Sequence, residues 1–405
     1  MPLADPRDAP PIVAGMTSAC TVFDEQLTEY NFGPSHPMSP LRIDLTFGLA
    51  RELGVVDGDA LPIVGATPAT DELLATVHSR DYIEAVRQVG ARPYDPRPAY
   101  GLGTDDNPAF EHMHDASALI VGASVEAARR VWTGECRRAA NIAGGLHHAM
   151  PGNASGFCIY NDCAVAIRWL LDNGASKVAY IDIDAHHGDG VQQIFYDDPR
   201  VLTVSLHETP QTLFPGTGTP AEIGGVDAQG SAVNVAVPPG TSDAGWLRAY
   251  HAVVPQVVRE FDPDIIVSQH GCDSHADDPL TNLMLSVDGQ RASHLAIEEL
   301  TESVCDGRWL ALGGGGYAVL DVVPRIWTHL LAIIGGDPLD PMTPTPEGWR
   351  RRVYELSGRD APERMTDGHS VAYKDWTSGY DPSSWLDRAI MATRREAFPF
   401  HGLLP

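Results

Sequence analysis

From about residue 160 onward, hydrophobic residues lie in short, unbroken runs, and segments with helical spacing separate these runs. Val, Ile and Leu dominate the runs at residues 177–182, 201–206, 232–237, 264–269 and 309–313. Unbroken runs of this length are typical of strands in a parallel sheet that is covered on both faces. The separating segments, 162–172, 190–196, 243–261 and 289–304, are predicted helices. The alternation predicts right-handed β-α-β crossovers around one central, mostly parallel sheet.

The first third of the chain is richer in helical patterns. Residues 39–53 begin with Ser-Pro, a favourable helix start, and residues 71–89 and 112–132 also show helical spacing. After about residue 336 the chain becomes proline-rich and then polar. We expect a single α/β domain over residues 1–405, with a core at about 20–335 and a C-terminal tail, 336–405, that packs on it.

Polar residues gather where the predicted strands end. These ends are residues 141–149, 182–187, 205–207, 270–273 and 313–317. Open parallel sheets bind ligands beyond the carboxyl ends of their strands. We therefore expect these five segments to converge on one rim of the sheet.

The sequence DIDAHH places Asp182, Asp184 and His186 on one face of an extended chain, because alternate side chains point the same way. Asp273 ends another apolar run. Buried carboxylates are costly unless a cation neutralises them, and carboxylate with imidazole suits Zn²⁺ or Fe²⁺. A solvated turn that caps the next helix is the alternative for DxDxH alone. Asp273 and the histidines at other strand ends favour a metal site of Asp184, His186 and Asp273.

The adjacent His147 and His148 follow a strand and two glycines. They can point the same way only if the chain turns sharply there, and an isolated pair of histidines often has no function. Beside a metal they are candidates for general base and acid, with Asp182 and Asp189 behind them to fix their tautomers.

Four glycines, 313–316, precede Tyr317. The run lacks the signature of a phosphate-binding loop. Flexible glycines would instead let Tyr317 reach a substrate carbonyl opposite the metal and stabilise an oxyanion. The alternative is a tyrosine that packs on the end of the sheet.

The formal net charge is −26, from 54 acidic and 28 basic side chains. This charge disfavours nucleic acid as a partner and attracts cationic substrates, although solubility alone is a sufficient reason for much of it. The six cysteines form no C-x-x-C pair, residues 1–16 lack a signal-peptide pattern, and no apolar stretch is long enough for a bilayer. We expect a soluble cytoplasmic protein with reduced thiols that does not contact a membrane.

Several motifs resemble those of zinc-dependent histone deacetylases, in the same order along the chain. They are GGLHHA, SGFCIYNDCAVAI, YIDIDAHHGDGVQ, SLHE and LGGGGY, and the resemblance covers about residues 20–335. The chain looks most similar to the bacterial acetoin-utilisation deacetylases. The resemblance implies the arginase/deacetylase fold, a single α/β domain with a mostly parallel eight-stranded sheet, and it leaves the C-terminal tail without a counterpart.

The resemblance also implies residue roles. Asp184, His186 and Asp273 match the Zn²⁺ ligands, Tyr317 matches the tyrosine that polarises the carbonyl, and the two histidines match the tandem pair, with His148 as base and acid and His147 as its electrostatic partner. The positions that match the substrate channel and its surroundings are Phe157 and Phe214 as walls, Gly156, Leu280 at the mouth, Asp106 at the rim and Arg42 in the acetate-release cavity. A K⁺ site would use Asp182, Asp184, His186, Ser205 and Leu206.

The implied activity is hydrolysis of Nε-acetyl-lysine in a protein, with release of acetate. The resemblance suggests a metabolic enzyme such as acetyl-CoA synthetase as the substrate. Deacetylation of acetylpolyamines is an alternative, but such enzymes carry an acidic residue at the channel mouth, where this chain has Leu280. A module that binds acyl-lysine without turnover would have lost a ligand or Tyr317, and an arginase-like site with two metals would need more ligands. The patterns do not indicate an oligomeric state.

Overall fold

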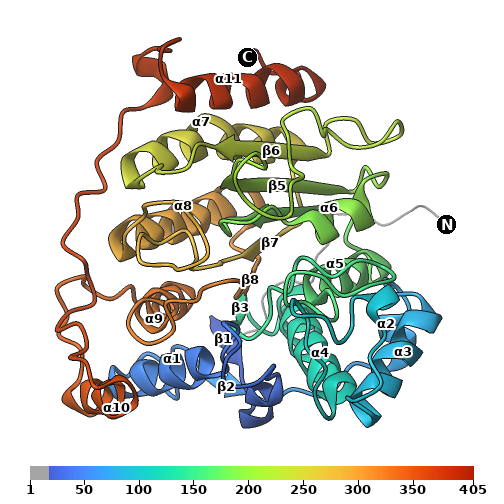
Figure 1. Cartoon of the computed structure of the whole chain (residues 1–405). Helices are drawn as coiled ribbons and strands as arrows, with labels where there is room; N and C mark the ends of the chain where they lie inside the picture. The colour runs from blue at the N-terminus through green and yellow to red at the C-terminus, as the bar shows by residue number, and fades with distance from the viewer. Residues whose placement is uncertain (1–17) are drawn as a thin grey trace.

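Eight parallel strands form one sheet at the centre of the computed structural model, which describes residues 18–405 (Figure 1). The strands are β1 Ala19–Val22, β2 Ile63–Val64, β3 Arg138–Asn141, β4 Val178–Asp182, β5 Val201–Glu208, β6 Ala232–Val237, β7 Ile265–Gln269 and β8 Trp309–Leu312. Their order across the sheet is β2-β1-β3-β8-β7-β4-β5-β6. The five apolar runs are all strands, as predicted. The short β1 and β2 were not predicted, and β2 has only two residues, too few for a recognisable pattern.

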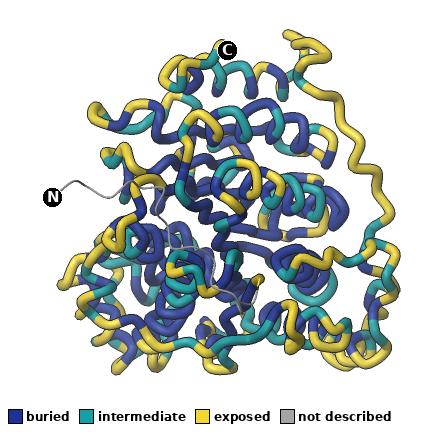
Figure 2. The backbone as a smooth tube through the Cα atoms, turned by 180° about the vertical axis from the view of Figure 1, so that it is seen from behind, coloured by how far each residue is buried: buried dark blue, intermediate teal, exposed yellow. Residues whose placement is uncertain are grey.

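Helices cover both faces of the sheet and leave its strands largely buried, except for the half-buried edge strand β2 (Figures 1 and 2). On one face lie α4 Met113–Trp132, α5 Asp162–Asp172 and α6 Asp189–Phe195. On the other lie α1 Leu41–Glu52, α7 Asp243–Phe261, α8 Val287–Cys305 and α9 Val323–Ile334. Burial on both faces explains why the strand sequences are unbroken apolar runs rather than alternating ones.

The predicted helix at 71–89 is wrong, because the structure has two helices there. These are α2 Asp71–Leu74 and α3 Arg80–Ala91. The side chain of Ser79, whose backbone is extended, accepts a hydrogen bond from the Tyr82 amide and so caps the start of α3. The buried ring of His78 accepts a bond from the amide of Asn161 at 3.0 Å, which fixes the turn between the helices against α5.

The register of the strands lines up the residues from which the candidate site starts. Across β3, β8, β7, β4 and β5 one row of paired positions contains Asn141, Leu312, Gln269, Asp182 and Ser205. All five strands are parallel, and β3, β8, β7 and β4 end at this row, so the segments that follow them leave the sheet at the same edge, as predicted. The predicted strand end at 205–207 is wrong, because β5 continues to Glu208 while it pairs with β6.

The C-terminal segment after α9 runs along one side of the molecule (Figure 1). Its helix α10 Glu347–Ser357 contacts α1, and α11 Trp385–Ala397 contacts β6 and α7 beyond the edge of the sheet. The buried Arg248 of α7 pairs with Asp387 of α11 at 2.8 Å and lies over the ring of Trp376.

Short 3₁₀ helices occur at Glu25–Glu29, Pro98–Tyr100, Trp376–Ser378 and Phe398–His401. Within residues 18–405, no helix is both long and apolar enough to cross a membrane. The expectation that residues 1–16 carry no signal peptide lies outside the described residues.

Candidate active site

Asp184, His186 and Asp273 form a cluster at the carboxyl ends of β4 and β7. Each offers a ligand atom, and these atoms all lie within 4.8 Å of one another. His186 Nδ1 lies 3.1 Å from Asp184 Oδ1 and 2.9 Å from Asp273 Oδ2. All three side chains are buried. The grouping that the sequence predicted is therefore present as a compact two-carboxylate, one-imidazole set.

The chemistry of this cluster fits a divalent cation. Burial, followed by the charge of Asp184, raises the pKa of Asp273 to about 7. Burial by itself would lower the pKa of His186, but the two carboxylates raise it to about 10. Both shifts show that two neighbouring carboxylates out of water need positive charge beside them. A metal with oxygen and nitrogen ligands, such as Zn²⁺ or Fe²⁺, meets that need.

Main-chain and side-chain donors hold the two carboxylates in place. The Ala185 amide donates to Asp273 at 2.9 Å, and the Gly315 amide donates to Asp184 at 2.8 Å. The side-chain amide of Gln269 donates to the same Asp184 oxygen at 2.7 Å. Each of these bonds satisfies one lone pair and orients the carboxylate, as supporting residues do around metal ligands.

His147 and His148 both point into the site, because the chain turns sharply in front of them. Gly145 has a φ of +88°, and a Cβ there would collide with the main chain at Gly313. The Nε2 atoms of the two rings lie 3.0 Å apart. Each Nδ1 atom lies 2.7 Å from a carboxylate, Asp182 for His147 and Asp189 for His148. The two backing carboxylates are where the sequence predicted them.

The two histidines differ in protonation. Burial by itself would lower the pKa of His147, but Asp182 and Asp184 raise it to about 9. Burial and the charge of His147 lower the pKa of His148. A hydrogen bond between two Nε2 atoms needs one N–H and one lone pair, which a charged His147 beside a neutral His148 provides. His148 is thus the ring equipped to accept a proton.

Tyr317 lines the same cavity as His147, His148, Asp184 and Gly156. Its ring packs edge-to-face against Phe157, with ring centroids 5.7 Å apart. The glycines before it are buried and closely packed rather than flexible, contrary to our expectation. A Cβ at Gly315 would collide with the carboxylate of Asp273, so the run is needed for close approach to the carboxylates.

Three of the residues matched to the substrate channel, Phe157, Phe214 and Asp106, contact residues that line this cavity. Phe214 packs edge-to-face on His148 with centroids 5.1 Å apart, and 46% of its surface is exposed. Leu280 is also exposed. Asp106 accepts a hydrogen bond from the Gly156 amide at 2.8 Å, which ties the 101–107 segment to the residue before Phe157.

Arg42 lies deeper, behind the glycine run. Its guanidinium donates to the Gly314 carbonyl at 2.7 Å and lies over the ring of Trp327. Arg42 and Met38 line one small cavity, and Met38 also lines the cavity that contains Tyr317. The two cavities therefore adjoin at Met38.

The positions matched to a K⁺ site lie on neighbouring strands. Asp182 of β4 pairs with Ser205 of β5, and Leu206 follows Ser205. The hydroxyl of Ser205 lies 2.8 Å from His207 Nδ1. The K⁺ site itself stays a prediction.

Sequence reasoning missed several residues that support the site. Gln269 holds Asp184, Tyr180 donates to Asp182 at 2.7 Å, and Asp278 accepts a bond from the Tyr317 amide at 2.8 Å. Gln269 and Asp278 lie on either side of the predicted strand end at residues 270–273, which contains Asp273, so proximity to a candidate ligand was an available signal. Their partners depend on the three-dimensional arrangement and could not be deduced from spacing.

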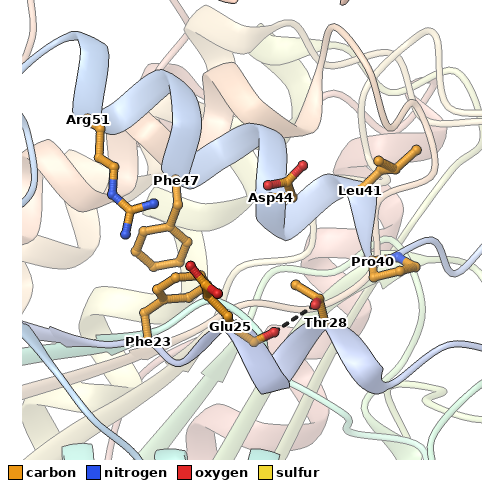
Figure 3. A pocket seen from close by; sticks show the side chains of 8 residues that line it. All are labelled: Phe23, Glu25, Thr28, Pro40, Leu41, Asp44, Phe47 and Arg51. Atoms are coloured by element: carbon orange, nitrogen blue, oxygen red, sulfur yellow. Dashed lines mark hydrogen bonds between the residues drawn. The ribbon is translucent and has the colours of Figure 1, made fainter. Parts of the chain in front are cut away.

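A separate surface pocket of about 450 Å³ lies between α1 and the segment after β1 (Figure 3). Its lining includes the stacked rings of Phe23 and Phe47 together with Glu25, Asp44 and Arg51. None of its lining residues belongs to the candidate site, and we assign it no role in the chemistry.

Comparison with known proteins agrees with this geometry. Residues 36–334 match the histone deacetylase domain. The chain is 42% identical to the acetoin utilization protein AcuC of Bacillus subtilis (strain 168) over 337 residues, which cover 82% of this chain and 86% of that protein. It is 39% identical to AcuC of Staphylococcus xylosus, covering 85% and 90% of the two chains.

Solved structures show the same fold. The crystal structure of an HDAC homolog from Aquifex aeolicus superposes with a TM-score of 0.79 at 27% identity, covering 93% of this chain and all of that one. An HDAC homolog complexed with SAHA gives a TM-score of 0.78 at the same identity and coverage. The predicted resemblance and the eight-stranded fold are confirmed, and the sheet is parallel throughout rather than mostly parallel.

Asp273→Asn should remove metal binding and leave the fold intact. Asparagine keeps the size of the side chain and can still accept from the Ala185 amide, but it lacks the charge. Metal affinity should fall by more than the roughly 10–100-fold that loss of an outer partner costs. Mass spectrometry of bound metal and thermal denaturation with and without added Zn²⁺ measure this.

Asp278→Asn is the matched control, because Asp278 is a buried acid of the same loop and not a member of the cluster. It should keep its metal. Without metal, Asp273→Asn should be at least as stable as the wild type above pH 7. Because folding raises the pKa of Asp273 from its ordinary value of 3.8 to about 7, the free energy of unfolding of the metal-free wild type falls as the pH rises through this range. Asparagine does not ionise, so the variant escapes this loss. Normal metal content in Asp273→Asn would exclude this cluster as the metal site.

Proposed function

Since this chain belongs to the histone deacetylase family, we propose that it hydrolyses Nε-acetyl-lysine in protein substrates and releases acetate. One observation carries the proposal. The buried cluster of Asp184, His186 and Asp273 reaches, through Asp184, the cavity that His148 and Tyr317 line from other strand ends. That combination provides a cation site, a base and a hydroxyl donor for one acyl group.

Asp184, His186 and Asp273 would hold Zn²⁺, with Fe²⁺ as the alternative. The bound ion supplies Lewis-acid polarisation of the acyl carbonyl and lowers the pKa of a water molecule. The protein's part is to keep the three ligands oriented through Ala185, Gly315 and Gln269.

His148 acts as the general base and then as the general acid. Its lowered pKa keeps it neutral. Its Nε2, which accepts the His147 N–H at 3.0 Å in this structure, would take a proton from the attacking water once substrate and water displace that contact. Asp189 at 2.7 Å fixes the other nitrogen as the N–H and so keeps the lone pair on Nε2. The same proton then passes to the lysine nitrogen as the C–N bond breaks. His147, held by Asp182, contributes a positive charge beside the reacting atoms.

Tyr317 donates its hydroxyl hydrogen to the acyl oxygen as negative charge develops there. Burial and the charges of Asp273 and Asp184 raise its pKa, so the hydroxyl keeps its proton and remains a donor. The edge-to-face contact with Phe157 restricts the ring.

The apolar channel residues favour a lysine side chain as the tether. Phe157 and Phe214 can flank the lysine methylenes, while Asp106 at the rim accepts from the substrate backbone. The exposed Leu280 offers no charge to a polyamine, which favours protein substrates.

Two further proposals concern acetate release and a K⁺ site, and both involve residues that lie deeper than the channel walls. We propose that acetate leaves through the cavity lined by Met38 and Arg42, because the guanidinium attracts a carboxylate. We also propose K⁺ bound by Asp182, Asp184, His186, Ser205 and Leu206. The net charge of −26 suits substrates with basic surfaces, and a metabolic enzyme such as acetyl-CoA synthetase is the target class we favour.

His148→Ala and Tyr317→Phe should each lower kcat on an acetyl-lysine peptide by at least about a hundredfold, because each removes a group that acts in the transition state. Bound metal should stay at the wild-type level. Tyr94→Phe, at an 83% exposed tyrosine, is the matched control and should retain full activity. Turnover near the wild-type rate in either site variant would contradict its proposed role.

The wild type should cleave acetyl-lysine peptides with a higher kcat/KM than acetylspermidine. Leu280→Glu should raise the relative kcat/KM for acetylspermidine by roughly threefold to fivefold, the scale of one exposed ion pair. A substrate panel of acetylated, longer-acyl and polyamine compounds measures both. A wild-type preference for the polyamine would replace the protein deacetylase proposal with the small-molecule one.

A further inference from the structure

We propose that Asp367, in the C-terminal segment, is a positioning residue for Tyr317 and acts through His275 and Asp278. The inference rests on the role proposed for Tyr317. Residue 367 lies outside residues 36–334, the part of the chain that matches the deacetylase domain. The C-terminal segment would thus complete the active site.

The first step joins Tyr317 to Asp278. The Tyr317 amide donates to Asp278 Oδ2 at 2.8 Å, and the Leu280 amide donates to Oδ1 at 3.0 Å. Asp278 is buried, with 7% of the residue exposed. The four residues before Tyr317 are glycines and have no side chains to fix its position, so this hydrogen bond is a direct restraint on the main chain of Tyr317.

The second step joins Asp278 to His275. The Asp278 amide donates to the His275 carbonyl at 3.0 Å, and the Asp277 amide donates to His275 Nδ1 at 3.0 Å. Since Nδ1 accepts, the ring proton lies on Nε2. The buried ring therefore holds the 275–278 turn on one side and presents an N–H donor on the other.

The third step joins His275 to Asp367. His275 Nε2 donates to Asp367 Oδ2 at 2.9 Å, and the Val287 amide donates to the same oxygen at 2.8 Å. Arg325 of α9 pairs with Oδ1 at 2.8 Å. Burial alone would raise the pKa of Asp367, but His275 and Arg325 hold it below its ordinary value, so the residue is an anion.

Asp367 is itself rigidly placed. Asp288, near the start of α8, accepts bonds from the Thr366 hydroxyl at 2.6 Å, the Asp367 amide at 3.1 Å and the His369 amide at 3.0 Å. The path from Tyr317 through Asp278 and His275 to Asp367 is therefore anchored to two helices, α8 and α9.

The same segment borders Tyr317 on the surface. Arg359 lines a pocket of about 560 Å³ together with Tyr317, Asp277 and Asp321. By contrast, the pair of Arg248 with Asp387 is a buried ion pair of the same tail whose hydrogen bonds reach only the segments at residues 374–387. If these contacts only anchored the tail, loss of either Asp367 or Asp387 would affect turnover equally. If Asp367 positions Tyr317, only the loss of Asp367 should lower turnover.

Asp367→Asn is the first test. Asparagine has only one acceptor oxygen. Its NH₂ group would therefore face either Arg325 or the donors of His275 and Val287, and those donors would lose their acceptor. At a temperature well below unfolding, kcat on an acetyl-lysine peptide should fall about tenfold, because small displacements of a catalytic group are costly. KM should change by less than about twofold, since Tyr317 acts on developing charge.

A double variant tests the path. If Asp367 acts through the hydroxyl of Tyr317, adding Asp367→Asn to Tyr317→Phe should cause no further loss, whereas independent effects would multiply. Asp278→Asn, the second variant, should give the same kcat loss and the same non-additivity. It keeps the proposal testable if Asp367→Asn folds poorly.

Asp387→Asn is the control, and it should leave kcat unchanged. Hydrogen–deuterium exchange gives a readout without turnover: Asp367→Asn should speed exchange at the amides of Asp278 and Tyr317, and Asp387→Asn should not. Equal kcat losses in both tail variants, additive losses with Tyr317→Phe, or unchanged exchange would overturn the proposal. If the wild type cleaves no acetyl-lysine peptide, the proposed function fails, and exchange alone decides whether the path exists.

Discussion

Two carboxylates, Asp184 and Asp273, are buried side by side at the ends of adjacent strands, and the rest of the site depends on how their charge is accommodated. Water cannot solvate them there, and each uncompensated charge would be expensive. Main-chain amides, the Gln269 side chain and the imidazole of His186 supply partial compensation. The remaining need for positive charge is what makes this cluster a candidate metal site.

The need to accommodate the charge of these two carboxylates also constrains the residues around them. Gly315 must bring its amide within hydrogen-bonding distance of Asp184, which leaves no room for a side chain. Gly145 must turn the preceding strand end so that His147 and His148 enter the same space. The register of the parallel strands brings these pieces together, because β3, β8, β7 and β4 all end at one row of paired residues.

Much of this could be predicted from the sequence. The apolar runs identified the buried strands, and the polar residues after them identified the rim, since both patterns depend only on local order along the chain. The break between α2 and α3 could not be predicted, because helical spacing continues through it and the turn is fixed by contact with Asn161. The glycine run was assigned flexibility, whereas the structure uses it for close packing.

The supporting residues lay beyond what spacing can reveal. Gln269 and Asp278 are polar neighbours of a ligand, but their partners belong to other strand ends. Asp367 is harder still to identify from the sequence, because it lies 92 positions from His275, in a tail with no recognisable motif. Long-range hydrogen bonds of this kind require the folded arrangement.

Anomalous diffraction from crystals of the full chain grown with Zn²⁺ tests the central claim most directly. Data on the two sides of the zinc absorption edge should give a strong peak within coordination distance of Asp184, His186 and Asp273. A zinc-loaded crystal with no peak among these three residues, or with its ordered zinc bound elsewhere, would contradict the assignment of this cluster as the metal centre.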